Sequence, residues 1–407
     1  MLAESIGLWY LFNKMVIPVD RFIAAQCIYH SAVISLVFVI LQVPYNAAIM
    51  AHERMDYFAF LSVLDAVLRL GIVLLLPYLY GDKLIIYGLL ILAIGILNFF
   101  LSYIYCKRRF KEILWRKRFE KQLFLSMVGF SGWNLFGTFS GVMRDQGINI
   151  VLNLFGGPVV NAARGIAIQI NSALRSFVGN IQIPVRPQIV QSYAQNNIDK
   201  SISLMYTVSK LSCCVFLTMA VPLSMEINYV LNLWLGKSIP TFTSIFTIIV
   251  VYNTLISILN SSTSMIVHAS GIMKNYQLYG SIVQLLSIPI SYIALKYGAD
   301  PEIALILVFL FDALSHIVCL FVVKGIISIS IWDYTKKIVF PIAYILFISL
   351  PFLFIIRQLL KAGFIRFIIS ITFGVICVIT ISYLVALTSN EKAIVKSYIK
   401  KMINKVR

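Results

Sequence analysis

The sequence predicts an all-α, polytopic membrane protein with about eleven transmembrane helices. Of its 407 residues, 60% are apolar and only 12% are charged. Apolar windows of about 20 residues recur along the chain, the length that a helix needs to cross a hydrocarbon core of ~30 Å. Irregular backbone cannot replace helix inside a bilayer, because its polar groups would find no hydrogen-bond partners there. Composition and window length therefore both indicate a bundle of membrane-spanning helices.

Each apolar window ends where charged or turn-forming residues begin, and these edges define the expected spans. The expected spans are 24–50, 57–80, 84–106, 123–153, 159–185, 203–226, 241–265, 277–297, 303–324, 338–357 and 366–387. The first residues, MLAESIGLWYLF, are apolar but too short to cross. They fit either the end of a helix whose beginning is absent or an amphipathic helix in the membrane interface.

Basic residues between the spans predict the orientation of the chain. The densest basic segment is the loop 107–121 (KRRFKEILWRKRFEK), and the second is the tail 392–407. Cytoplasmic loops carry an excess of Lys and Arg, so we expect both segments, and hence the C-terminus, in the cytoplasm. Alternation then places loops 186–202 and 325–337 on the same side. The expected location is therefore a cell membrane that the chain crosses several times.

Several other functions are disfavoured by composition. The formal charge of +18 is spread over short loops, which fits the orientation rule better than nucleic-acid binding. The six cysteines and four histidines show no paired metal-ligand spacing, so we expect no metal and no cofactor. Membrane polymerases or ligases would carry catalytic residues on a large outer loop, whereas the expected outer loops are short. We therefore expect no enzymatic activity.

Cations inside the expected spans are the main functional signal. Arg144, Arg164, Arg175 and Lys210 all lie within apolar stretches. A cation at bilayer depth costs at least ~2.5–3.5 kcal/mol, so it normally faces a bundle interior or a watery cavity. We expect these four residues to line one wet interior that binds an anionic group.

Two of the spans carry polar residues on a single helical face. At 100° per residue, Arg164, Asn171, Arg175 and Gln182 fall within one narrow sector. The segment 241–268 repeats the pattern, with Asn253, Ser257, Asn260, Ser264 and His268 on one face. Small polar residues also join helices through hydrogen bonds, and that structural role remains open for Ser257, Asn260 and Ser264 individually.

Acidic residues inside the spans are candidates for binding a coupling proton or sodium ion. Asp312 has no obvious partner nearby in sequence, whereas Asp145 can pair with Arg144. A structural role for each of these two acids is an equal alternative. Asp65 and Arg69 lie four residues apart on one span, which favours a structural ion pair.

Four sequence strings resemble a known family. IPVDRFIAAQCIYHSAVIS, VPYNAAIMAHERMDYFAF, LFGGPVVNAARGIAIQINSAL and PQIVQSYA are similar to stretches of bacterial polysaccharide-biosynthesis flippases of the multidrug/oligosaccharidyl-lipid/polysaccharide exporter superfamily. The likeness is strongest to O-antigen and capsule repeat-unit flippases. It implies a MATE-like fold of two helical bundles around a central cavity, with an extra helix pair at the C-terminus.

The same resemblance implies how the chain is divided. Residues 1–120 would form an incomplete N-terminal bundle, 121–325 a six-helix bundle, and 326–407 the extra helix pair and the basic tail. Family members usually have two further helices, and the start of a third, before ESIGLWYL. We therefore expect the chain to begin inside an ancestral helix of the first bundle.

The function implied is transport of a polyprenyl-pyrophosphate-linked oligosaccharide across the bacterial cell (inner) membrane for surface polysaccharide biosynthesis. In that function the cargo and the bilayer are partners of the protein, together with a proton or sodium ion and other polysaccharide-assembly proteins. The expected substrate-binding residues are Arg144, Arg164, Asn171, Arg175, Gln182, Lys210, Asn253 and Asn260, with Asp145 and Asp312 as ion-coupling candidates. Alternatives are a multidrug or cation exporter of the same superfamily and a non-functional truncated flippase.

Overall fold

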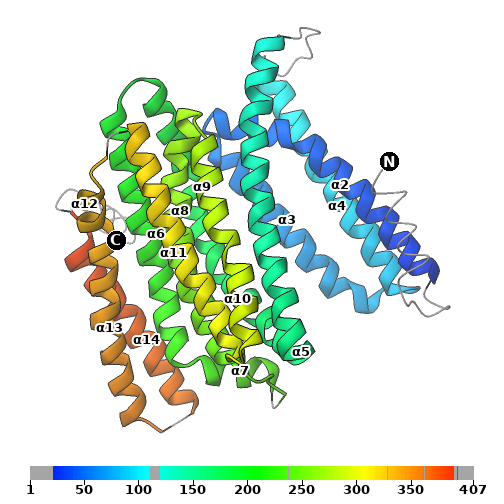
Figure 1. The fold of residues 1–407 in the computed structure, drawn as a ribbon. Helices are drawn as coiled ribbons and strands as arrows, with labels where there is room; N and C mark the ends of the chain where they lie inside the picture. Colours follow the sequence, from blue (N-terminus) through cyan, green and yellow to red (C-terminus); the bar gives the residue numbers. More distant parts are fainter. Residues whose placement is uncertain are drawn as a thin grey trace, which may run out of the picture. The chain divides into compact units, whose positions relative to one another are not determined.

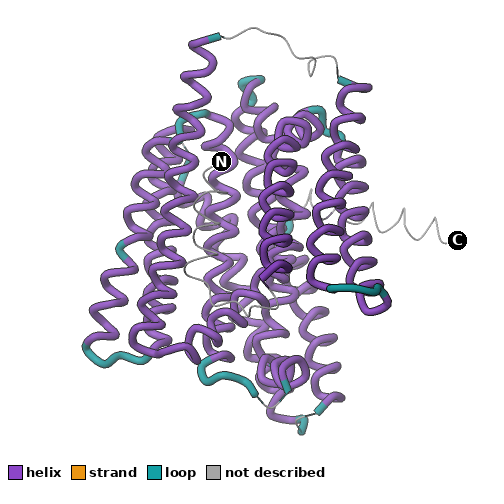
Figure 2. Tube along the Cα trace, turned by 90° about the vertical axis from the view of Figure 1, so that its right-hand side faces the viewer, coloured by secondary structure: helices purple, strands orange, loops and turns teal. Residues whose placement is uncertain are grey.

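The computed structural model describes residues 22–110, 120–236, 238–327, 329–361, 363–388 and 392. These residues form helices and no strand (Figure 2). Among them, ten helical segments are long and apolar enough to cross a membrane. The predicted all-helical architecture is therefore confirmed, and the number, length and apolar composition of these helices are compatible with a multi-pass membrane protein. The expected segment 1–12, most of the basic loop and nearly all of the tail lie outside the described residues.

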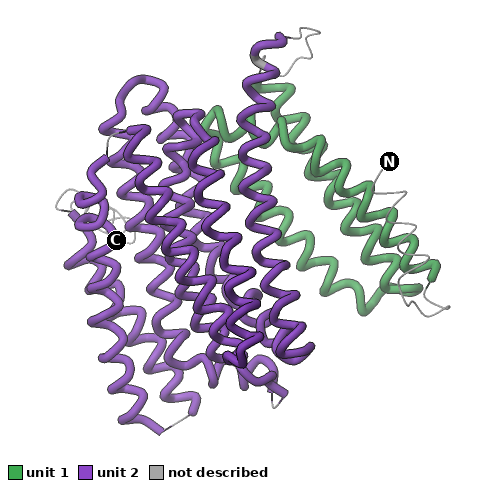
Figure 3. Tube along the Cα trace, viewed as in Figure 1, with its two compact units in different colours: residues 1–119 green, residues 120–407 purple. Residues whose placement is uncertain are grey.

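The chain forms two compact units, residues 1–119 and 120–407 (Figure 3). The described residues of the first unit form three long helices, which match the expected spans to within a few residues. They are α2 (Phe22–Ala51), α3 (Met55–Leu75) and α4 (Lys83–Arg109), with a short 3₁₀ turn η2 (Leu76–Tyr78) after α3. These helices bury few side chains within the unit, because most of their apolar residues face outward.

Polar contacts join the helices of the first unit. The Gln42 side-chain amide donates to the Ser102 hydroxyl over 3.0 Å, which links α2 to α4. Asp65 accepts a hydrogen bond of 2.7 Å from Arg69 and one of 2.8 Å from Asn98, which links α3 to α4. The predicted ion pair between Asp65 and Arg69 is thus confirmed, and a third partner fixes it between two helices.

The second unit contains the remaining helices (Figure 1). They are α5 (Lys121–Ala194), α6 (Ile198–Met225), α7 (Ile227–Leu235), α8 (Thr243–Ser270), α9 (Lys274–Leu285), α10 (Ser287–Lys296), α11 (Pro301–Ile327), α12 (Ile331–Tyr334), α13 (Phe340–Leu359) and α14 (Phe364–Ile381). Two π-helical turns, η4 (Thr335–Val339) and η5 (Ser382–Ala386), precede α13 and follow α14.

Two local features of this unit differ from the expected spans. The nine-residue α7 was not expected, and it is too short to cross a bilayer. The expected single span 277–297 is divided into α9 and α10 at Leu286. The ring of Pro289 excludes a normal helical approach to the carbonyl of Leu285, four residues earlier, which explains why α9 ends there.

The long helix α5 is a hairpin rather than one rod. Gly157 interrupts it with φ 71° and ψ −172°, a backbone conformation that is not helical. A guanidinium nitrogen of Arg164 donates to the backbone carbonyl of Asp145 over 2.9 Å, although these residues would lie ~28 Å apart in a continuous helix. The two arms of α5 therefore lie side by side and run in opposite directions. They correspond to the expected spans 123–153 and 159–185.

Helix α6 is the most enclosed helix of the unit. In its most apolar stretch, 67% of the residues are buried, and it packs against α5, α8, α13 and α14. Phe216 and Leu217 of α6 are fully buried in one core with Ile258 of α8 and Val323 of α11. The core of the second unit therefore surrounds α6.

One buried ion pair attaches α14 to the end of α6. The Glu226 side chain, 1% exposed, accepts a hydrogen bond of 2.8 Å from Arg366 and one of 3.0 Å from Ser370. One turn further along α14, Gly374 approaches Pro222 so closely that a Cβ atom would lie 2.8 Å from the proline ring. Helix α14 is thus held against the end of α6 by the Glu226–Arg366 ion pair and by the close approach of Gly374 to Pro222.

Replacing Gly157 with Ala should destabilise the protein by about 1–3 kcal/mol, because only glycine adopts this backbone conformation without strain. No neighbouring atom would contact the new methyl group, so the backbone alone carries the effect. Gly165→Ala is the matched control: that glycine is helical and equally open, so alanine should be neutral or stabilising there. Thermal unfolding in detergent measures both, and equal midpoints would contradict the hairpin.

Replacing Arg366 with Met should cost about 3–5 kcal/mol, because it leaves the Glu226 carboxylate buried without its counter-charge. Adding Glu226→Gln to the same chain should restore part of the loss, since no buried charge then remains unpaired. Arg357→Met, at the neighbouring end of α13, is the control and should change little. Unfolding midpoints of the wild type, the two single variants Arg366→Met and Glu226→Gln, the double variant and the control test this, and strictly additive effects of the two single variants would show that the pair does not interact.

Candidate functional site

The arms of α5 enclose, together with α8 and α11, a cavity of about 280 Å³, here called the arginine cavity. Its polar lining consists of Arg144, Asp145, Arg164, Asn171, Ser172, Arg175, Asn253, Thr254 and Ser257. The hairpin at Gly157 brings Arg144 and Arg164 to the same cavity from opposite arms. The structure thus brings together three of the four cations predicted from the sequence, with both predicted acids.

Arg144 and Asp312 form the central contact of the arginine cavity. A guanidinium nitrogen of Arg144 donates a hydrogen bond to one carboxylate oxygen of Asp312, whose side chain is only 3% exposed. Its other nitrogens donate to Asp145 over 2.9 and 3.1 Å. Asn253 donates to the second Asp312 oxygen over 2.8 Å. Both carboxylate oxygens of Asp312 therefore accept a hydrogen bond, and Asp312 connects α11 to α5 and α8.

Arg164 has a mainly structural set of partners. It is 5% exposed and donates to the carbonyl of Asp145 and, through a short hydrogen bond, to the side-chain oxygen of Asn149. Its distance of 4.0 Å from the Asp145 carboxylate is also compatible with an ion pair. Both partners lie on the opposite arm, so Arg164 fastens the hairpin. Its Nε remains buried without a partner in the described structure.

Arg175 differs from the other two arginines. It lies on the second arm of α5, is exposed, and makes no hydrogen bond or ion pair within the described part of the chain. Three arginines against two aspartates leave one positive charge in the cavity. Because Arg144 contacts both acids and Arg164 approaches one of them, Arg175 is the guanidinium with its donors available to a ligand.

A second cavity of about 280 Å³ shares Arg144, Arg175 and Ser257 with the first, and we call it the hydroxyl cavity. Its other polar lining residues are Asn260, Ser261, Ser264, Tyr276, Gln277, Ser281, Gln284 and Ser315. No acidic residue lines it. The shared arginines make the two cavities one continuous polar region, with charge in one part and hydroxyl and amide groups in the other.

The predicted amide residues divide between lining and packing roles. Asn171 lines the arginine cavity, and its oxygen accepts a hydrogen bond of 2.7 Å from Thr254. Gln182 is buried between helices, where it accepts from Ser261 over 2.8 Å and donates to Ser262 over 3.2 Å. Gln182 therefore joins α5 to α8 and lines neither cavity.

Asn260 begins a hydrogen-bonded path that leaves the hydroxyl cavity. Its side-chain oxygen lies 3.0 Å from His316 Nδ1, and the other ring nitrogen lies 3.2 Å from the hydroxyl of Tyr334. His316 and Tyr334 are both buried. The path connects α8 through α11 to α12, and both nitrogens of the histidine are used in it.

Lys210 lies elsewhere. The sequence led us to expect it beside the three arginines, but it lines a separate pocket and donates a hydrogen bond of 3.3 Å to the carbonyl of Ala386. The reason is that α6 packs Lys210 against the turn η5 that follows α14. The periodicity of one helix does not show which other helix packs against each of its faces. The expected group of four cations is therefore corrected to three.

One residue that binds a lining arginine, and one set of lining residues, were not found from the sequence. Asn149, which binds Arg164, lies one helical turn after Asp145, so the same phase argument would have placed it on the polar face. Gln277, Gly280, Ser281 and Gln284 share one face of α9 at spacings of three, four and seven residues. That periodicity is visible in the sequence. It lies at the start of the expected span 277–297, where the polar residues read as the edge of the span.

Comparison with protein-family models, curated proteins and solved structures finds no match to this chain. What the protein does is therefore inferred from the charges and hydrogen-bonding groups of the two cavities, together with the four strings that resemble flippases. The MATE-like arrangement and the flippase activity expected from that resemblance stay predictions.

Proposed function

We propose that the protein is a MATE-like flippase that moves a polyprenyl-pyrophosphate-linked oligosaccharide across the bacterial cytoplasmic membrane. The observation that carries the proposal is Arg175, whose guanidinium donors are available in a polar cavity that retains one positive charge. A cation at bilayer depth is costly, so a cavity that keeps one suits an anionic ligand. The flippase-like sequence strings support the same cargo.

The arrangement of polar groups suits the parts of such a cargo. Arg175 binds a phosphate oxygen directly, since a guanidinium presents paired donors that match phosphate geometry. Arg144, which lines both cavities, lies beside the same position. The serine, asparagine and glutamine groups of the hydroxyl cavity can exchange hydrogen bonds with sugar hydroxyls. In this arrangement the prenyl chain stays in the lipid.

Asp312 supplies a means of coupling in this proposal. Its carboxylate neutralises Arg144, so a proton or sodium ion bound at Asp312 competes with that arginine. Arg144 is then released toward the phosphate. Asp145, whose side chain is 52% exposed and also contacts Arg144, is the second candidate for the same role.

Export of an organic cation is the alternative function within the same superfamily. A cationic drug would have to enter a cavity with one excess positive charge and find its two acids already bound by arginine. That arrangement favours anionic over cationic cargo. A binding assay with both kinds of ligand separates the two functions directly.

Replacing Arg175 with Gln should weaken binding of farnesyl pyrophosphate, a short analogue of the lipid carrier, by about tenfold, because a charge-assisted hydrogen bond is lost. Binding of farnesol, which has the same chain and no phosphate, should not change. Fluorescence-based titration of the purified protein in detergent gives both affinities. Transport is measured as the amount of surface polysaccharide in a strain that lacks its own flippase, and Arg175→Gln should lower that amount.

The matched control is Arg186→Gln. Arg186 is an exposed arginine ~16 Å further along the same arm, beyond the ~10 Å screening length at 0.1 M salt, and it lines neither cavity. Its replacement should change the affinity by less than about twofold. Unchanged pyrophosphate binding by Arg175→Gln, or tighter binding of an organic cation than of the pyrophosphate, would refute the proposed cargo.

Replacing Asp312 with Asn should tighten binding of farnesyl pyrophosphate several-fold, because it removes one negative charge and frees Arg144. It should also remove the dependence of transport on an ion gradient. Asn keeps the size of the side chain, and its oxygen can still accept from Asn253. If the affinity falls in parallel with the unfolding midpoint, or if the gradient dependence persists, Asp312 has a structural role only.

A further inference from the structure

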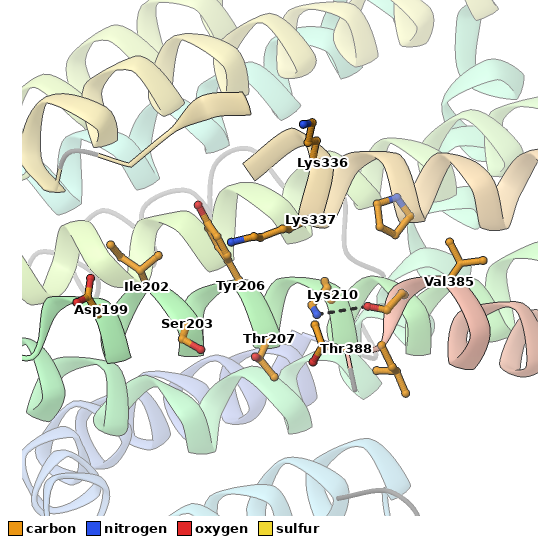
Figure 4. Close-up of a pocket in the computed structure, with 13 residues that line it drawn as sticks. Asp199, Ile202, Ser203, Tyr206, Thr207, Lys210, Lys336, Lys337, Val385 and Thr388 are labelled. Carbon is orange, nitrogen blue, oxygen red and sulfur yellow. Dashed lines mark hydrogen bonds between the residues drawn. The ribbon is translucent and has the colours of Figure 1, made fainter. Parts of the chain in front are cut away.

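The pocket that contains Lys210 is separate from the two cavities described above. It has a volume of about 430 Å³ and lies between the first half of α6, the turn η4 with the start of α13, and the turn η5 at the end of α14 (Figure 4). Its lining runs along α6 from Asp199 to Lys210, which is ~16 Å of helix. It shares no lining residue with the arginine cavity or the hydroxyl cavity.

The charged lining of this pocket is mainly basic. Among the residues that the structure describes, Lys210, Lys336 and Lys337 line it together with one acid, Asp199. Lys210 is 5% exposed and donates to a backbone carbonyl at its inner end. In Figure 4, Lys337 extends toward the ring of Tyr206, and its Nζ lies 5.6 Å from the ring centroid. The ammonium groups of Lys210 and Lys337 thus come from two facing elements.

The backbone around this pocket is also unusual. Both π-helical turns of the described residues, η4 and η5, contribute to its wall, η4 through its lysines and η5 through Val385 and Ala386. Such turns are rare within helices and occur frequently at functional sites. The presence of two such turns at one pocket is a second observation that points to a binding site, and it is independent of the pocket's charge.

Much of the remaining lining is apolar, and it includes Ile202, Pro341, Val385 and Leu387. Ser203, Thr207 and Thr388 add hydroxyl groups to it. Trp332, whose ring lies 4.9 Å from Lys336 Nζ, and Tyr206 are of the residue types enriched where a helix leaves the hydrocarbon. A ligand of this pocket therefore carries an anionic group and an apolar part.

We propose that this pocket binds the phosphate of an anionic phospholipid, with Lys210 and Lys337 contacting the headgroup and the acyl chains lying along α13 and α14. Basic pockets between membrane helices bind anionic lipid headgroups, and each lysine there contributes through its charge. The site is independent of the cargo proposed above, because it uses none of the same residues.

The test compares two lipids that have the same acyl chains. Purified protein is titrated with dioleoyl-phosphatidylglycerol or dioleoyl-phosphatidylcholine in detergent, and bound lipid is measured by native mass spectrometry. The wild-type chain should prefer the anionic lipid. Lys337→Gln should reduce that preference about fivefold, the effect of one lysine near an anionic lipid. Asp199→Asn should increase it by a similar factor.

Lys200→Gln is the matched control, because Lys200 is an exposed lysine of the same helix that does not line the pocket. It should leave the lipid preference within about twofold of the wild type. Lys337 and Asp199 are both exposed, and their opposite effects cannot both arise from loss of folding. A thermal unfolding midpoint recorded for each variant confirms that the fold is kept.

Three outcomes overturn the proposal. Equal binding of the two lipids by the wild-type protein would exclude an anionic site. An equal loss in Lys200→Gln and Lys337→Gln would show diffuse attraction to the basic surface. If inorganic phosphate or glycerol phosphate displaces the anionic lipid at the affinity of the lipid itself, the pocket is a site for a soluble phosphate compound.

Discussion

The ion pair between Arg144 and Asp312 is the contact on which the polar interior of the second unit depends. An unpaired charge inside a bilayer is costly, so a chain that keeps five charged side chains around one cavity must balance most of them. Asp312 does this from α11, while Asn253 of α8 satisfies its second oxygen. One carboxylate therefore fixes the positions of three helices, α5, α8 and α11. The cavity keeps its shape because removing any partner would leave a buried charge or dipole unsatisfied.

This balance also decides what the cavity can bind. Arg164 is directed at the opposite arm of its own hairpin, and Arg144 is held between two carboxylates, so neither behaves as an isolated positive charge. Arg175 has no such restraint within the described residues. The sequence shows three equivalent arginines, whereas the structure gives them different roles: one closes the hairpin, one balances the acids and one faces the cavity.

The helices were predictable because the apolar stretches are long and because charged or turn-forming residues separate them clearly. The polar stripe of α5 was also predictable, since residues on one face of a helix share a phase whatever surrounds them. Contacts between distant residues were not: Arg144 and Asp312 are separated by 168 positions, and no periodicity relates them. Lys210 shows the same limit, because its place in an apolar stretch predicted burial but not which neighbouring segment covers it.

The position of Arg144 makes the proposed coupling reciprocal. It lines both cavities and binds Asp312, so a cation at Asp312 and a phosphate beside Arg144 both act on the same ion pair. If the cation favours release of Arg144, linkage requires the bound phosphate to favour the cation by the same factor. A carboxylate that touched no cargo-binding residue would give no such relation. Within the proposed flippase, the Arg144–Asp312 contact is therefore both what holds α5 and α11 together at the cavity and what the cargo must displace.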